Sequence, residues 1–287
     1  MRTRSTLQHG PVTGHQFAYS PTRLVKPFPV WCYTLGNALI DTGQRHCQAD
    51  VLTTFATQQL EKIILTHFHE DHSGNATALA QQHNCPVLTG DLTAQRIANG
   101  FTLLPYERFW FGAIDACSSA SGVVVKPLPT EITAGDYRLK PIFTPGHSND
   151  HHVFLEPREG WLFAGDFYVG NLKIFRRGEN IYQMIDSTRT VLQHDFNTVF
   201  CGHNPVPTTG KLAIERKLNY LETIVERVLA AHKRGLRGQA LVGAAGLREQ
   251  WGVKLFTQND VGADYIVQSV LNDASPANPP TAPVVEP

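Results

Sequence analysis

A dense cluster of metal-binding residue types occupies residues 66–72, which read Thr66-His67-Phe68-His69-Glu70-Asp71-His72. Imidazoles and carboxylates at such close spacing favour a bound cation over an ordinary polar loop. The preceding run, residues 63–66, is apolar and β-branched like a buried strand, and residues 73–82 favour a helix. The cluster is therefore expected on a strand-to-helix loop, at the carboxyl end of a strand, where side chains can converge on a ligand.

Three further strand ends carry the same residue types. The segments are Thr144-Pro145-Gly146-His147, Gly165-Asp166 and Gly202-His203, each after an apolar run. Each carries a glycine, which lets backbone approach closely. A single strand-end His or Asp is more often a capping residue, but the recurrence together with the cluster indicates one shared site.

These motifs resemble the pattern of the metallo-β-lactamase-fold hydrolases: H-x-H-x-D-H, a later His after a Thr-Pro-Gly turn, a Gly-Asp and a Gly-His. The resemblance runs from about residue 29 to about residue 207. It implies one metal held by His67, His69 and His147, a second held by Asp71, His72 and His203, and Asp166 as the bridge. It also implies that Asp41 supports the site loop without binding metal.

Seven donors are too many for one tetrahedral zinc and suit two metals that each keep a position open for water. The absence of thiolate from the set favours zinc, with iron or manganese as the other choices. The expected function is a dinuclear hydrolase that uses a metal-bound hydroxide on an ester, thioester, lactone or amide. Asp71 is expected to carry a proton from the nucleophile to the leaving group.

Other functions remain open on the same motifs. One alternative is a non-haem iron redox enzyme of the persulfide dioxygenase type, which the resemblance associates with a mononuclear His/His/Asp set. Another is a ligand-binding relative without catalysis. Among hydrolases, the sequence resembles the glyoxalase II and lactonase groups, although residues 202–205 read Gly-His-Asn-Pro where glyoxalase II has a Gly-His-Glu-Tyr-Thr segment.

Recognition of a small-molecule substrate is assigned to residues after the bridging carboxylate. Tyr168 follows Asp166 by two positions, so its phenol could donate to a substrate oxygen. Lys173, Arg176 and Arg177 could hold a substrate carboxylate or phosphate. The alternative is that Tyr168 packs and the cations are solvated. Residues 101–121 are rich in aromatic side chains and could form a lid or pack on the core.

Composition limits the partners and the location. The chain has 287 residues, is 42% hydrophobic and has zero formal net charge with His neutral, which gives no support for a nucleic-acid or acidic-membrane partner. No apolar run of signal-peptide or membrane-spanning length is seen, so a cytoplasmic protein is expected. Five cysteines at scattered spacing argue against a disulfide framework.

Strands grouped in each half of the chain, with helices between and after them, predict an α+β fold: an αββα sandwich of two mixed sheets, as in the family. We expect a catalytic domain over residues 1–210 and a C-terminal helical region over 211–273. That region begins with a long helix over 211–234 whose apolar stripe could cover a sheet or a partner helix, so a homodimer is possible. Residues 274–287 are rich in Pro and Ala and are expected to be disordered.

Overall fold

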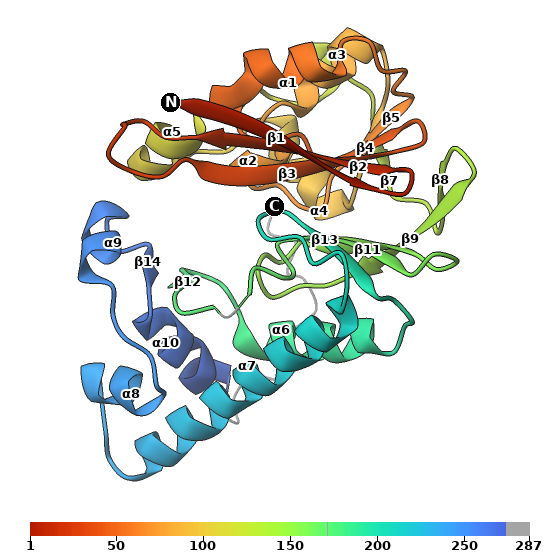
Figure 1. Cartoon of the computed structure of the whole chain (residues 1–287). Helices are drawn as coiled ribbons and strands as arrows, with labels where there is room; N and C mark the ends of the chain where they lie inside the picture. The colour runs from red at the N-terminus through yellow and green to blue at the C-terminus, as the bar shows by residue number, and fades with distance from the viewer. Residues whose placement is uncertain (171, 274–287) are drawn as a thin grey trace.

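The computed structural model describes residues 1–170 and 172–273. Two β-sheets pack face to face in the centre of the molecule, and helices cover the outer face of each sheet (Figure 1). The predicted αββα sandwich is therefore confirmed.

The larger sheet is built from the N-terminal part of the chain. Within the described residues it has seven strands in the order of the sequence: β1 (Arg2–His9), β2 (Val12–Tyr19), β3 (Phe28–Leu35), β4 (Ala38–Ile40), β5 (Lys62–Ile64), β6 (Val87–Thr89) and β7 (Val125–Pro127). The pairs from β1 to β4 are antiparallel, whereas β4, β5, β6 and β7 run parallel. The sheet is therefore mixed, and its parallel part sends the ends of β4 and β5 to the same edge.

The second sheet comes from the following segment. In the described part of the chain its order is β13 (Thr198–Cys201), β11 (Trp161–Gly165), β10 (His152–Glu156), β9 (Tyr137–Phe143) and β8 (Ile132–Ala134). β11 and β13 are parallel, and the other neighbours are antiparallel. Because β11 and β13 run the same way, the residues that follow each of them leave the sheet at one edge.

Alternation of side chains along the strands creates the layers. In β3, Trp31 and Tyr33 face the second sheet, while Cys32 between them faces the covering helices. In β5, Ile64 faces the second sheet and Ile63 faces the helices. Because side chains alternate between the two faces of a strand, a strand buried on both sides reads as a continuous apolar run.

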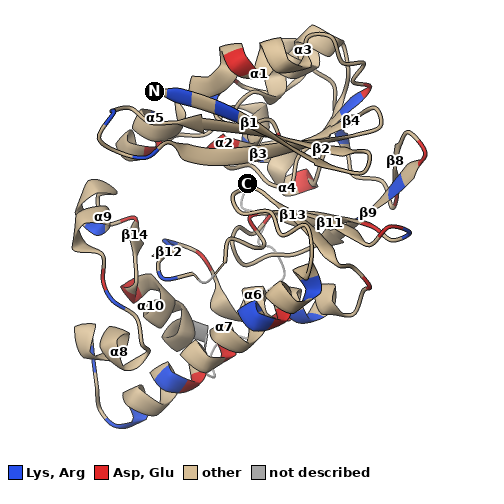
Figure 2. Cartoon of the chain, viewed as in Figure 1, with Lys and Arg blue, Asp and Glu red and all other residues tan. Residues whose placement is uncertain are grey.

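The helices cover the outer faces. Over the larger sheet lie α1 (Gln48–Phe55) and α3 (Ala76–His83), with η1 (Arg45–Cys47), α2 (Glu70–Ser73), α4 (Asp91–Ala98), α5 (Pro105–Phe111) and η2 (Ser119–Ser121) in the connections. The second sheet is covered by α6 (Ile181–Leu192) and α7 (Gly210–Lys233), through contacts such as those of Val191 and Ile214 with Val199. Lys, Arg, Asp and Glu are interspersed along the outer face of α7 (Figure 2).

The C-terminal region packs on these outer helices. It contains α8 (Gln239–Ala244), α9 (Trp251–Phe256) and α10 (Asp264–Asp273), and β14 (Val261–Gly262) pairs with β12 (Phe175–Arg176). A separate apolar cluster joins α6, α7, α8 and α10. The expected domain boundary at residue 210 stays a prediction, and the expected tail over 274–287 lies outside the described residues. None of the described helices has the length and apolar character needed to cross a bilayer.

Some sequence expectations needed correction. The N-terminal hairpin of β1 and β2 was not predicted, because exposed β1 has mixed polar residues and no apolar run. The helix expected over 73–82 begins only at Ala76, as α3, because the short helix α2 ends at Ser73. In segment 101–121, the aromatic side chains of α5 mainly pack: Phe109 and Trp110 contact Phe256 of α9.

All five cysteines are buried and free, as expected for a chain without a disulfide framework.

Candidate metal centre

Four loops that follow strands bring the predicted donors together at one edge of the sandwich. The cluster 66–72 follows β5, His147 follows β9, Asp166 follows β11 and His203 follows β13. Backbone hydrogen bonds hold the loops in place across the two sheets: Trp31 N donates to Gly202 O at 2.8 Å, and His152 N donates to Thr66 O at 2.9 Å. Neither sheet carries a complete set of donors, so the site exists only where the two sheets meet.

Two glycines are required by the close approach of these loops. A Cβ on Gly202 would lie 2.6 Å from His72 Cε1 and 2.7 Å from Asp166 Oδ1. Gly165 has a φ of +45°, and a Cβ there would lie 2.7 Å from Thr66 Oγ1. Any side chain at either position would displace a donor or its support, which explains the Gly-Asp and Gly-His pairs in physical terms.

The first group of donors consists of His67, His69 and His147, whose ring nitrogens converge. His67 Nε2 lies 2.9 Å from His69 Nδ1, and His147 Nε2 lies 3.0 Å from the same atom. All three side chains are buried or nearly so. Three nitrogens at such distances form one face of a small coordination polyhedron.

The second group consists of Asp71, His72, Asp166 and His203. His72 Nε2 lies 3.1 Å from Asp166 Oδ1, and His203 Nε2 lies 3.2 Å from the same oxygen. Asp71 Oδ2 closes the group at 3.4 Å from His203 Nε2. The donors therefore surround a second centre next to the first.

Asp166 contacts both groups. Its Oδ1 lies 3.1 Å from His72 Nε2 and 3.2 Å from His203 Nε2, and its Oδ2 lies 3.3 Å from His203 Nε2 and 3.5 Å from His147 Nε2. The carboxylate therefore lies between the two groups and contacts donors of both, which is what a bridging carboxylate needs.

Several of the histidine rings contact an oxygen atom through the nitrogen that is directed away from the other donors. His72 Nδ1 lies 2.7 Å from Asp41 Oδ2, and His147 Nδ1 lies 2.5 Å from Glu179 Oε1. His203 Nδ1 lies 2.8 Å from Pro29 O, and His67 Nδ1 lies 2.9 Å from Thr66 Oγ1. Such partners fix the orientation of each ring and leave Nε2 free for a metal.

Asp41 has the supporting role that the family resemblance implies. It accepts hydrogen bonds from the Thr66 backbone N at 2.9 Å and from the Thr66 hydroxyl, in addition to its contact with His72. The residue adopts a left-handed conformation with φ of +58°, at the end of β4. One carboxylate therefore positions a donor in each group, because Thr66 in turn contacts His67.

The two groups differ in charge. Burial and the neighbouring imidazoles lower the pKa of His67 and His69 well below the usual value, so both rings are neutral. Burial also opposes charge on His72 and His203, but nearby carboxylates outweigh it and raise the pKa of His203 to about 9. Burial would raise the pKa of Asp166, yet His203 and His72 hold it well below the usual range.

The donor set fits two divalent cations. Tetrahedral zinc with nitrogen ligands at about 2.0–2.1 Å separates the ligand atoms by about 3.3 Å, close to the observed spacing in the first group. In the second group, His72 Nε2 and Asp166 Oδ1 are buried and lie 3.1 Å apart, but neither atom has a hydrogen bond of good geometry within the described residues. Such polar atoms in a protein interior usually have a partner, and a cation between the donors would supply it.

A cleft of about 560 Å³ opens beside the first group. Its lining includes His69, His147, Phe68, Phe101 and Arg96. Phe101 is thus the member of the aromatic segment 101–121 that reaches the site, as a wall residue.

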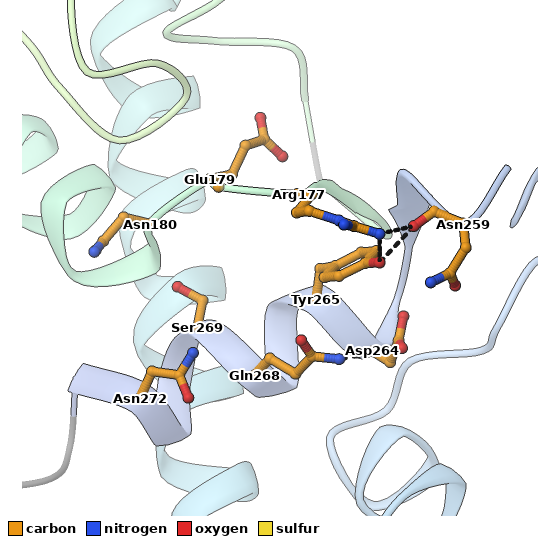
Figure 3. A pocket seen from close by; sticks show the side chains of 10 residues that line it. Arg177, Glu179, Asn180, Asn259, Asp264, Tyr265, Gln268, Ser269 and Asn272 are labelled. Carbon is orange, nitrogen blue, oxygen red and sulfur yellow. Dashed lines mark hydrogen bonds between the residues drawn. The ribbon is translucent and has the colours of Figure 1, made fainter. Parts of the chain in front are cut away.

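The predicted anion-binding residues are placed differently from one another. Arg176 lines the cleft, but its guanidinium pairs with Glu107 and, at 3.2 Å, with Asp260. Arg177 also lines the cleft and borders a neighbouring pocket, where it donates to Asn259 O at 3.1 Å and to the Tyr265 hydroxyl at 3.2 Å (Figure 3). The charge of Arg176 is therefore balanced inside the protein.

Two other predicted residues lie away from the cleft lining. Lys173 is exposed and borders a different hollow, with Tyr220 and Arg248. Tyr168 is partly buried and packs against the apolar cluster of Val199 and Ile214. Burial raises the pKa of the Tyr168 phenol, which therefore stays protonated and able to donate.

Sequence reasoning missed two residues that support the donors. Glu179 contacts His147 and also accepts a hydrogen bond from Arg176 N at 2.8 Å. His151 is fully buried, and its Nε2 accepts the backbone N–H of Asp166 at 3.2 Å. The sequence gives no clear signal for Glu179, which lies in an irregular loop, whereas His151 follows His147 by four positions and could have been noticed.

The sandwich and the site define a class: a metal-binding protein whose paired donor groups lie at the edge between two sheets. The family model of the metallo-beta-lactamase superfamily matches residues 25–203, which is more than half of the chain. The chain therefore belongs to the metallo-beta-lactamase superfamily.

Individual relatives are distant. A hydroxyacylglutathione hydrolase of Legionella pneumophila (strain Lens) is 28% identical over 203 residues, which cover 66% of this chain and 67% of the relative. A probable metallo-hydrolase, YybB, of Bacillus subtilis (strain 168) is 29% identical over 132 residues, 46% of this chain and 56% of the relative. The chain thus spans between about half and two thirds of the length of these curated relatives.

Solved structures support the fold. A beta-lactamase domain protein from Burkholderia ambifaria superposes with a TM-score of 0.64 and 16% identity, over 94% of this chain and 89% of that one. A metallo-beta-lactamase from Pontibacter korlensis superposes with a TM-score of 0.59 and 21% identity, over 77% and 99%. At such identities the likeness shows the fold alone.

Proposed function

We propose that this protein is a dinuclear metal-dependent hydrolase that cleaves an ester, thioester, lactone or amide bond in a small molecule. The observation that carries the proposal is the carboxylate of Asp166, which lies 3.1 Å from His72 Nε2 of the second group and 3.5 Å from His147 Nε2 of the first. Both groups are complete in this chain, so neither centre depends on a residue from another molecule. The similarity to a hydroxyacylglutathione hydrolase supports a hydrolytic reaction.

The metals would be zinc by preference, with iron or manganese as alternatives, because the donors are imidazoles and carboxylates without thiolate. His67, His69 and His147 would hold the first ion, and Asp71, His72 and His203 the second, with Asp166 between them. Two bound divalent ions supply an activated water and polarise the carbonyl oxygen of the substrate.

Side chains of the protein would carry out the proton transfers. Asp71 lies at the second group with its side chain only 9% exposed, so its carboxylate can accept a proton from the nucleophile and return it to the leaving group. Tyr168 follows the bridging residue and keeps its phenolic proton, which could be donated to a substrate oxygen. Tyr168→Phe, compared with wild type on one ester, measures that contribution.

Elemental analysis of protein purified without chelator, combined with a panel of acyl esters, thioesters and lactones, tests the function. About two metals per chain and turnover of at least one substrate class are expected. A stoichiometry near one that is unchanged in His72→Ala would contradict the dinuclear assignment. Bound iron with oxygen consumption on a persulfide would replace it with the redox function of the persulfide dioxygenase type.

A further inference from the structure

We propose that Arg96, together with Phe68 and Phe101, forms a subsite for a carboxylate carried on the acyl part of the substrate. The inference rests on the proposed hydrolase function and specifies its substrate class. It assigns anion recognition to a residue of α4, in place of the arginines that follow β12.

The subsite lies directly beside the first group of donors. The Arg96 guanidinium carbon is 4.1 Å from the centre of the Phe68 ring, and the Phe68 ring is 4.6 Å from the ring of its neighbour His69. All three residues line the same cleft. A short acyl chain can therefore reach from the metal centre to the guanidinium.

The walls between these two points are apolar and fixed. Phe68 and Phe101 meet edge to face with their ring centres 5.0 Å apart, and both line the cleft. The backbone N of Phe68 donates to Asp150 Oδ2 at 3.0 Å, which holds the loop in place. Methylene groups of an acyl chain would pack against these rings, because burial of apolar surface is favourable.

Arg96 has unused hydrogen-bonding capacity. A guanidinium carries five N–H donors, and here its Nη2 donates to Asn149 Oδ1 at 2.9 Å. Among the described residues, no carboxylate lies within 4.0 Å of the Arg96 nitrogens. Its planar fork, oriented by the ring beneath it, suits a carboxylate, which can accept two parallel hydrogen bonds.

The other charges of the cleft have partners. Arg176 pairs with Glu107 and Asp260, and Glu179 contacts His147 and the Arg176 backbone. Arg177 also lines the cleft, but its guanidinium lies against Tyr265 of α10 and donates to Asn259 O (Figure 3). Arg96 is thus the cation in this cleft whose charge faces neither a carboxylate nor the C-terminal helices.

A matched pair of substrates tests the subsite. The anionic member is p-nitrophenyl hydrogen glutarate, and the neutral member is p-nitrophenyl pentanoate, which has the same chain length. For the metal-loaded wild type we expect a higher kcat/KM on the anionic ester. In Arg96→Gln the ratio of the two kcat/KM values should fall at least tenfold, mainly through KM, because the charge-assisted hydrogen bonds are lost.

Arg158→Gln is the matched control. Arg158 also stacks on an aromatic ring, with its guanidinium carbon 5.0 Å from the centre of Tyr137, but it lies in the turn at the opposite end of β11. Both rates should be unchanged in this variant. Arg96→Lys keeps the positive charge but lacks the planar guanidinium, so it should give an intermediate ratio of the two kcat/KM values. This variant replaces Arg96→Gln in the test if Arg96→Gln fails to fold.

The outcomes separate the two proposals. An equal ratio in wild type and Arg96→Gln, or a wild-type preference for the neutral ester, overturns the subsite while leaving the hydrolase function intact. If no ester, thioester, lactone or amide is cleaved, the hydrolase proposal fails, and calorimetric titration of the metal-loaded protein with glutarate tests the subsite alone. Binding that weakens at least tenfold in Arg96→Gln supports it, and unchanged binding rejects it.

Discussion

The two donor groups use similar residue types but differ in the charges that their side chains carry. The first group is built from imidazoles alone: burial keeps His67 and His69 neutral, whereas the pKa of His147 is raised because its contact with Glu179 outweighs its burial. The second group pairs two carboxylates with His72 and His203, whose pKa values are raised. Without metal, the second group is held by its own ion pairs, whereas the nitrogens of the first group face one another.

This difference determines what each centre requires of a cation. A metal at the first group finds His67 and His69 already neutral, so little proton release from them is needed. A metal at the second group must displace protons from His72 and His203 but gains the attraction of two carboxylates. Asp166 connects the two, because it neutralises charge in one group and contacts His147 in the other.

Removal of the connecting carboxylate should have the largest effect. In Asp166→Ala we expect loss of metal from both groups and loss of turnover, because two nearby cations would lack charge compensation. Elemental analysis and ester hydrolysis measure the two quantities, with exposed Asp195→Ala as the control. A variant that kept both metals and more than about a tenth of the wild-type rate, a cost below about 1.4 kcal/mol, would show that Asp166 is not the bridge.

Variants that remove a donor from one group should lower the metal content of that group only. His67→Ala and His203→Ala each remove one donor from a different group, so each should lower the metal content from about two to about one per chain. Turnover should fall by at least a hundredfold in both, since the reaction is proposed to use both ions. Loss of both metals in either variant would mean that the two centres bind metal only together. That result would contradict the proposed difference between them.

Supporting residues should have smaller effects, of about tenfold to a hundredfold on metal affinity. Asp41→Asn should weaken both centres, because Asp41 contacts His72 directly and His67 through Thr66. Glu179→Gln should weaken the first centre alone, through His147. Competition with a chelator measures each affinity. Equal losses at the two centres in Glu179→Gln would contradict the separation of the groups.

The smallest effect concerns a buried cation beneath the second group. Lys217 of α7 is 3% exposed, and its ammonium donates to the carbonyl of Phe167, next to Asp166. Burial lowers the pKa of Lys217 to about 8, from an ordinary 10.5. Between these pH values the unfolded chain holds a proton that the folded chain has released, so stability should rise with pH.

Lys217→Met should remove that rise. The difference in free energy of unfolding between wild type and variant should change by about 2 kcal/mol in favour of wild type between pH 8 and pH 9.5. Urea unfolding at the two pH values measures it, and subtraction removes the contribution of groups that the two proteins share. If the difference in free energy of unfolding between wild type and variant is the same at both pH values, Lys217 does not titrate in this range.

Local patterns predicted much of the fold. The strand ends before His147, Asp166 and His203 lie where the apolar runs predicted them. β11 and β13 are buried along their whole length, whereas Phe143 at the end of β9 is exposed. The long helix α7 also follows from the periodicity of its apolar residues. The N-terminal hairpin escaped prediction because its edge strand is exposed, and exposed strands lack the apolar signal.

The sequence by itself determined the donor types and the strand ends that carry them, because ligand chemistry and burial depend on residue identity and local spacing. Tertiary structure alone decided that the carboxylate of Asp166 lies between the two groups, and that Glu179 contacts His147. It also determined the partners of the two arginines. Arg176 pairs with carboxylates from distant segments, whereas Arg96 contacts an aromatic ring and an amide. Partners so far apart in the chain leave no local pattern, since only the packing of the two sheets and their covering helices brings them together.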